Sequence, residues 1–193
     1  SHGMSQTSLD LGDDTAHDPG GKVRLRLGAG VHGDAVMSED GRYRQLMRRW
    51  LGDAFPENYI LFIGMNPSTA DATVDDPTCA REWTFARREG FSAMVKCNVG
   101  DYRATDPKML IQPGVVAVSP ANIPAIRQAA NGAGRIVLCH GKLNKALAPA
   151  GRELVAALRS DNLDLWCFGT NADGSPKHPL YLRADTPLIP FPA

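Results

Sequence analysis

Asn66 is the polar side chain of this sequence that is best placed to do chemistry. It comes after the apolar run Ile60–Gly64 and stands directly before Pro67 and Ser68. A short apolar run bounded by turn residues is typical of a strand buried on both faces, and such strands belong to parallel sheets covered by helices. Ligands of open parallel sheets bind beyond the carboxyl ends of the strands. Pro67 restricts Asn66 to extended conformations, so we expect this turn to hold the Asn66 side chain still at a binding site.

Polar side chains also follow the other predicted strands. These are Asn98, Asp101, Tyr102 and Arg103 after the second strand, His140 and Lys142 after the third, and Asn171, Asp173, Lys177 and His178 after the fourth. Because the carboxyl ends of parallel strands share one edge of a sheet, we expect one site at this edge. Asn66 and His178 should face a common cleft, with Arg103 and His140 on the same rim.

Strands and helices alternate from residue 42 onward. The predicted strands are 42–51, 59–63, 93–98, 135–140 and 164–168, and the predicted helices are 77–89, 122–130 and 149–159. Asp76 and Pro77 form a cap and first-turn signal, and Gly90 ends the first helix. This alternation predicts a three-layer α/β/α fold with a central, mainly four-stranded parallel sheet. Residues 42–51 mix polar and apolar side chains, which favours a half-exposed edge strand at the N-terminal side.

The chain has 193 residues, enough for one domain with a full core, which we place at residues 38–193. Residues 1–3 resemble a tag remnant, and the Gly- and Asp-rich segment up to residue 37 is typical of a flexible arm. No apolar run reaches the roughly 18 residues of a membrane span, and no secretory signal is present. We therefore expect a cytoplasmic protein that does not enter a membrane.

Charge and cysteine content narrow the functional classes. Lys plus Arg and Asp plus Glu both total 21, so the formal net charge is zero, which argues against a dedicated nonspecific nucleic-acid binder. The arginine cluster at positions 42, 44, 48 and 49 is interpreted as a solvated charged face. The four cysteines are scattered without a C-x-x-C pair, which is typical of buried thiols in a reducing compartment. Neither a metal nor a cofactor is predicted.

Two loops resemble the uracil-DNA glycosylase superfamily. Gly64-Met65-Asn66-Pro67-Ser68 is similar to its G-x-N-P motif, and His178-Pro179-Leu180 is similar to its second, His-Pro-Ser turn. The order of elements is also similar, with one motif after the first parallel strand and the other after the last. From about residue 43 to 191, the chain more closely resembles the uncharacterised family named domain of unknown function 1643. The segments that carry this resemblance are 66–72 with 75–78, 102–107 and 178–182.

The glycosylase resemblance implies roles for particular residues. Asn66 would orient a water molecule beneath the sugar, and His178 would donate a hydrogen bond to a carbonyl of the departing base, as a neutral imidazole can do. The surrounding binding residues would be Gly64, Met65, Pro67, Ser68, Asn98, Arg103, His140 and Lys142, with Phe85 and Tyr102 as candidate aromatic platforms. Independently of the resemblance, Arg103 should grip a phosphate-bearing ligand as a planar fork, supported by Lys142 or Lys177. The alternative is a salt bridge from Arg103 to Asp101 or Asp106 that orders the loop.

The substrate class and two rival functions stay open. The second motif lacks the Ser and the basic segment with which glycosylases invade a duplex, so a free nucleotide, a nucleoside or an exposed modified base is the favoured ligand. A non-catalytic nucleotide- or nucleic-acid-binding module would share the same pocket. A metal-dependent phosphoester hydrolase would instead gather Asp71, Asp75, Asp76 and Asp101 around a divalent cation. No G-x-G-x-x-G follows the first buried strand, which argues against a dinucleotide site.

Overall fold

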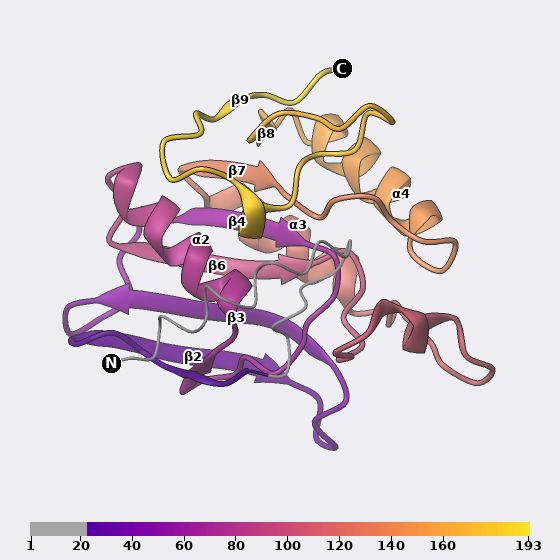
Figure 1. Cartoon of the computed structure of the whole chain (residues 1–193), viewed down its shortest axis with the longest axis horizontal. Coiled ribbons are helices and arrows are strands. Elements are labelled where there is room, and N and C mark those ends of the chain that lie inside the picture. Colours follow the sequence, from indigo (N-terminus) through magenta and orange to yellow (C-terminus); the bar gives the residue numbers. More distant parts are fainter. Residues whose placement is uncertain (1–22) are drawn as a thin grey trace.

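A mixed β-sheet forms the centre of the molecule in this computed structural model, which describes residues 23–193 (Figure 1). Within these residues the sheet has seven strands in the order β2-β3-β6-β4-β7-β8-β9. Their bounds are β2 Val31–Met37, β3 Arg44–Leu51, β4 Ile60–Gly64, β6 Ala93–Asn98, β7 Arg135–Leu138, β8 Trp166–Cys167 and β9 Ile189–Pro190. The run β6-β4-β7-β8 is parallel, which confirms the predicted four-stranded parallel core.

The two central strands, β4 and β6, are buried at every position. Their largely apolar side chains pack on both faces of the sheet, as expected for strands of a covered parallel sheet. The parallel register pairs Ile60 with Met94 and ends by pairing Gly64 with Asn98. The loops that follow β4 and β6 therefore leave the sheet side by side.

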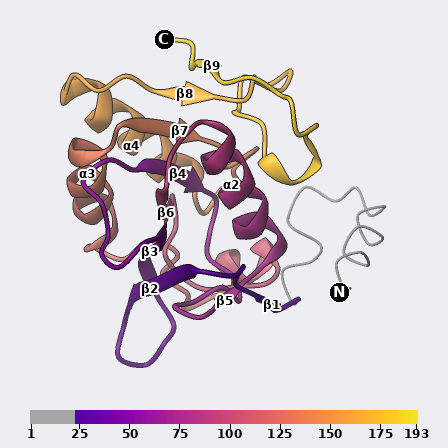
Figure 2. The ribbon, with the colours of Figure 1, turned by 90° about the vertical axis from the view of Figure 1, so that its left-hand side faces the viewer.

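Helices cover both faces of the sheet (Figure 2). Helix α2, Pro77–Arg88, lies on one face, and α3, Asn122–Gly132, and α4, Ala148–Ser160, lie on the other. Asp76 caps α2 by accepting a hydrogen bond from the Cys79 backbone N–H at 2.8 Å, and the chain leaves the helix through Gly90 at φ 85°. All three helices lie within a few residues of their predicted bounds.

The N-terminal edge of the sheet differs from the prediction. The segment predicted as an edge strand is β3, which is internal because β2 pairs with it on one side and β6 on the other. β2 lies within the segment expected to be a flexible arm, and the short β1, Leu25–Arg26, pairs with β5, Val74–Asp75. The boundary expected at residue 37 is therefore wrong. The remainder of the expected arm, residues 1–22, lies outside the described residues.

The C-terminal segment packs against α2 and buries a second side of this helix. The 3-10 turn η2, Pro179–Tyr181, packs against α2, and β9 extends the sheet antiparallel to β8. Phe85, expected to be a candidate aromatic platform, is 1% exposed, with its ring centroid 4.5 Å from that of Phe168. Helix α2 is therefore buried on two sides. Within residues 23–193, no helix is both long and apolar enough to cross a membrane.

Candidate functional site

A narrow cavity opens where the chain leaves β4 and β6. The predicted site residues that line it are Gly64, Met65, Asn66, Pro67, Ser68, Asn98 and His178. The remaining lining residues are Arg44, Asp76, Thr78, Cys79, Lys96, Ala104, Thr105 and Pro107. About 50 Å³ is open to the centres of water-sized molecules, and about 520 Å³ is empty when the open mouth is included. The structure thus brings Asn66 and His178 into one cleft, as the sequence predicted.

The Asn66 side chain is held in one orientation. Its Nδ2 donates to the carbonyl oxygens of Pro67 at 3.1 Å and Ala104 at 3.0 Å. The backbone N–H of Ala104 in turn donates to the Pro67 carbonyl at 2.8 Å, which ties the loop after β6 to the loop after β4. With the amide nitrogen engaged, Oδ1 accepts no hydrogen bond from the described residues. Asn66 therefore offers a fixed acceptor.

The His178 ring is oriented by its own turn. Its Nδ1 accepts a hydrogen bond from the Leu180 backbone N–H at 3.2 Å, at the start of η2. A backbone N–H can only donate, so the neutral ring carries its proton on Nε2. Gly141, in the loop after β7, lies beside His178, and its N–H donates to the Pro176 carbonyl. His178 thus presents Nε2–H as a donor.

Buried charged side chains form the floor of the cavity. Lys96 in β6 is 3% exposed, and its Nζ lies 2.6 Å from Oε2 of Glu82, which is fully buried in α2. Burial by itself lowers the pKa of Lys96, but the Glu82 carboxylate outweighs it and raises that pKa above its ordinary value. Burial raises the pKa of Glu82, opposed by Lys96 and by a hydrogen bond from the Cys139 thiol at 3.3 Å. The floor is thus built from an ion pair that joins the sheet to α2.

Arg44 completes the floor from β3. Its side chain is 1% exposed, and it donates to the Ala70 carbonyl at 2.9 Å and to Oδ1 of Asn98 at 3.1 Å. The bond to Oδ1 fixes the Asn98 amide with its nitrogen turned away from Arg44. Arg44 is one of the arginines interpreted from the sequence as a solvated face, and its burial contradicts that interpretation.

Arg103, Tyr102 and Phe85 do not line this cavity. Arg103 donates to three backbone carbonyls, those of Ser68 at 3.1 Å, Gly41 at 3.2 Å and Thr69 at 3.4 Å. Among the described residues Arg103 forms no ion pair with Asp101 or Asp106. Tyr102 packs edge-on against Tyr43, with ring centroids 5.4 Å apart, and Phe85 belongs to the core. Arg103 therefore orders the loop that carries Asn66.

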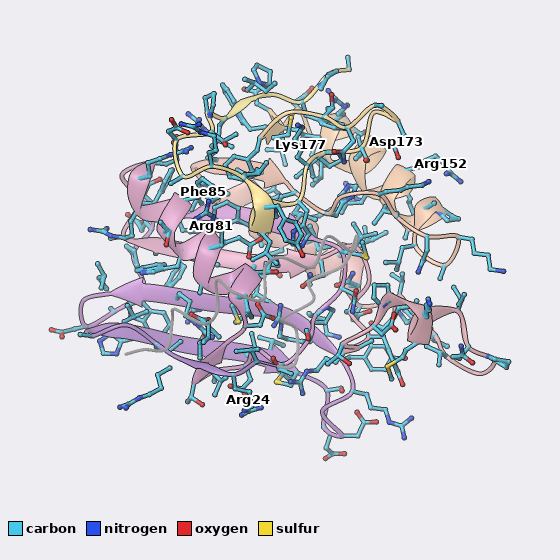
Figure 3. The ribbon with its side chains drawn as sticks, in the orientation of Figure 1. Arg24, Arg81, Phe85, Arg152, Asp173 and Lys177 are labelled. Carbon is cyan, nitrogen blue, oxygen red and sulfur yellow. The ribbon has the colours of Figure 1, made fainter. Side chains whose placement is uncertain are left out.

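His140 and Lys142 belong to a second, wider cavity beside α4. About 650 Å³ of it is open to the centres of water-sized molecules, and Arg152 and Asp173 also line it. Figure 3 shows Arg152 and Asp173 on the α4 side of the molecule, away from Arg81 and Phe85 on α2. Burial lowers the pKa of His140, and its Nδ1 lies 2.7 Å from the Gly141 carbonyl, which fixes the ring. The side chains expected to form one site at this edge of the sheet therefore lie in two separate cavities.

The carboxylates of the metal hypothesis are engaged separately. Asp71 accepts from the backbone of Thr73 and Val74, Asp75 pairs with Arg49 at 3.0 Å, and Asp76 caps α2. Asp101 accepts from Gln45 and Ser119. Within residues 23–193, no group of three or more His, Cys, Asp or Glu side chains is arranged to hold a metal ion. The metal-dependent hydrolase has no support in this geometry.

Lys96 and Arg44 are the site residues that sequence reasoning missed. Lys96 stands inside a strand that was predicted to be buried, and lysine is almost never fully buried unless it is paired. A lysine at a position predicted to be buried could therefore have identified Lys96 from the sequence. Arg44 gave no such signal, because β3 mixes buried and half-buried positions and β2, which makes it internal, was not predicted.

No curated protein and no solved structure gives a significant match. The resemblance to uracil-DNA glycosylases thus stays a prediction. Residues 42–180 match the family described as protein of unknown function (DUF1643), and this range includes β3, both motif-bearing loops and the whole cavity floor. Since the match spans most of the sequence, the chain belongs to the DUF1643 family.

Proposed function

We propose that this protein binds a nucleoside or nucleotide at the mouth of the Asn66 cavity and hydrolyses its N-glycosidic bond. The observation that carries the proposal is the opposite, fixed polarity of two side chains in one cleft. Asn66 presents Oδ1 as an acceptor, because Nδ2 is held by two carbonyls. His178 presents Nε2–H as a donor, because Nδ1 accepts from Leu180.

This polarity matches the needs of glycosidic cleavage. The transition state carries positive charge on the sugar and negative charge on the departing base. A fixed acceptor orients a water molecule toward the sugar, and a fixed donor stabilises charge on a base carbonyl. Both groups are set before the ligand arrives, so little reorganisation accompanies the reaction.

The arrangement of the fold supports the glycosylase-like assignment. The two motif-bearing loops follow β4 and β8, which belong to the run of four parallel strands, and both loops line the same cavity. Helices lie on both faces of the sheet. The narrow interior holds only a few water molecules at roughly 10–15 Å³ each, so the base lies at the mouth.

Base release tests this function. Candidate nucleosides, nucleotides and single-stranded oligonucleotides bearing uracil or modified bases are incubated with the protein, and free base is measured by chromatography. Asn66→Ala should lower turnover by roughly a hundredfold or more with binding nearly intact, because water positioning acts mainly in the transition state. His178→Ala should cost about 3 kcal/mol in turnover.

Asn171→Ala and His32→Ala are matched controls. Asn171 is exposed and donates to Ser175 in the loop after β8, and His32 packs against Trp50 at the far edge strand. Both should keep wild-type turnover. Equal losses in Asn66→Ala and Asn171→Ala would show that the effect is not specific to the cavity.

A non-catalytic binding module is the second candidate, and one observation favours it. Asp76 is the one carboxylate among the described residues lining the cavity, and it is engaged in capping α2. The site therefore lacks an unengaged strong base. If no base is released from any candidate while nucleotide binding persists and survives Asn66→Ala, the protein is a binding module.

A further inference from the structure

Three hydrogen-bond donors, from Arg44, Lys96 and Asn98, lie at the floor of the Asn66 cavity. Nε of Arg44 is buried and has no hydrogen-bond partner among the described residues. The other Arg44 nitrogens reach only neutral acceptors, Ala70 O and Asn98 Oδ1. Arginine stays charged at all physiological pH values, so burial cannot neutralise it. A buried cation without a carboxylate partner is costly, and it indicates that the charge has a use.

Two further donors converge on the same point beside Gly64. A Cβ atom built on Gly64 would lie 2.6 Å from Nζ of Lys96 and 3.0 Å from Nδ2 of Asn98. Both donors therefore border the space that the missing side chain leaves open. The Asn98 amide cannot turn round without losing its bond from Arg44, so Nδ2 stays directed to this space.

The charges around this point decide which group fits it. Lys96 is neutralised by Glu82, and Asp76 lies at the start of α2 with its carboxylate on the Cys79 N–H. Arg44 forms no ion pair with any described residue, although the Asp76 carboxylate also lines the cavity. The interior volume of about 50 Å³ suits a group of a few heavy atoms rather than a ring system.

We propose that the floor formed by Arg44, Lys96, Asn98 and Gly64 binds the oxyanion of a phosphorylated ligand. Two or three of its oxygens would accept from Nε of Arg44, Nζ of Lys96 and Nδ2 of Asn98. Charge-assisted hydrogen bonds of this kind are the strong ones in proteins. This subsite rests on the proposed function, which assigns the rest of the ligand. The base of a nucleoside monophosphate lies at the mouth between Asn66 and His178, and its phosphate reaches the floor.

Inorganic phosphate, four ribonucleosides and their 5′-monophosphates are the probes. Binding is measured by isothermal titration calorimetry at fixed ionic strength, and the thermal midpoint is followed with phosphate alone. The wild type should bind phosphate alone, and at least one monophosphate should bind ten times more tightly than its nucleoside or better. Equal affinity for the nucleoside and the monophosphate in every pair would overturn the subsite.

Two variants test the floor from different sides. Arg44→Gln removes the unpaired charge, and Gly64→Ala fills the space between Lys96 and Asn98 without removing a charge. Gly64 does not have a positive φ, so its backbone tolerates alanine, and the added methyl group displaces the end of the Lys96 side chain, which it would otherwise approach to 2.6 Å. Each should reduce the monophosphate preference to about onefold. Arg48→Gln is the control, because Arg48 lies on the same strand but pairs with Asp34 outside the cavity, and it should keep the preference.

The outcomes separate this subsite from the proposed function. If Arg44→Gln does not fold, Gly64→Ala decides alone. Phosphate binding that persists in folded Gly64→Ala would refute the subsite. Base release that is equally fast from nucleosides and monophosphates would support the function and refute the floor. Phosphate-dependent binding without release of any base, unchanged by Asn66→Ala, would support the floor and refute the proposed hydrolysis.

Discussion

Removing Lys96 should destabilise the fold more than most single substitutions. In Lys96→Met the Glu82 carboxylate is left fully buried, with Oε1 already unpartnered and only the Cys139 thiol on Oε2. Leaving one charge of a buried pair uncompensated costs about 3–5 kcal/mol. Against a typical total of about 5–15 kcal/mol, that loss is a large share of the free energy of unfolding.

The double variant Glu82→Leu with Lys96→Met tests whether the cost comes from the orphaned charge. Replacing both members of a buried pair with apolar side chains of similar volume is often neutral or stabilising. Urea denaturation, followed by tryptophan fluorescence, gives the free energy of unfolding for the wild type, the single variants and the double variant. The double variant should recover most of the loss.

The pH dependence gives a second, signed test of the same pair. Burial already raises the folded-state pKa of Glu82 above its ordinary value, and removing Lys96 removes the charge that opposes this rise. A raised carboxyl pKa favours folding below the unfolded-state pKa, and that contribution is lost as pH rises through the folded-state value. Lys96→Met should therefore be less destabilised near pH 4 than at pH 7. Additive losses in the double variant, or a deficit independent of pH, would refute the reasoning.

Two further predictions concern neighbouring residues. Burial outweighs the lowering effect of Arg49 and raises the pKa of Asp75 to about 6, so Asp75 contributes stability that is present below pH 3.8 and lost as pH rises through about 6. The difference between wild type and Asp75→Asn in the free energy of unfolding should change by about 3 kcal/mol across this window, measured by urea denaturation from pH 3.5 to 7; a constant difference would contradict the shift. Arg103→Ala should lower the free energy of unfolding by about 1–2 kcal/mol and weaken nucleoside and monophosphate binding by the same factor in calorimetry, because Arg103 holds loop carbonyls. A loss confined to the monophosphate would restore its phosphate role.

Local sequence signals were sufficient to predict the parallel core and the place of the two motif residues. The signals are local: apolar runs at β4 and β6, and Asp76 with Pro77 at the start of α2. The rule that parallel strands end at one edge then brings the loops of Asn66 and His178 together without knowledge of any side-chain contact. These features follow from backbone geometry and burial, which short segments encode.

The partners of the charged and aromatic side chains, in contrast, come from segments that are distant in the sequence. Lys96 meets Glu82 across the interface between sheet and helix, and Arg44 meets Ala70 and Asn98, which lie 26 and 54 positions away. β2 joins the sheet through backbone hydrogen bonds, which give no apolar pattern to read from its sequence. Whether an arginine is solvated or buried depends on what distant segments place over it. The charge of an arginine is known from the sequence, but the residues that surround it depend on how distant segments pack.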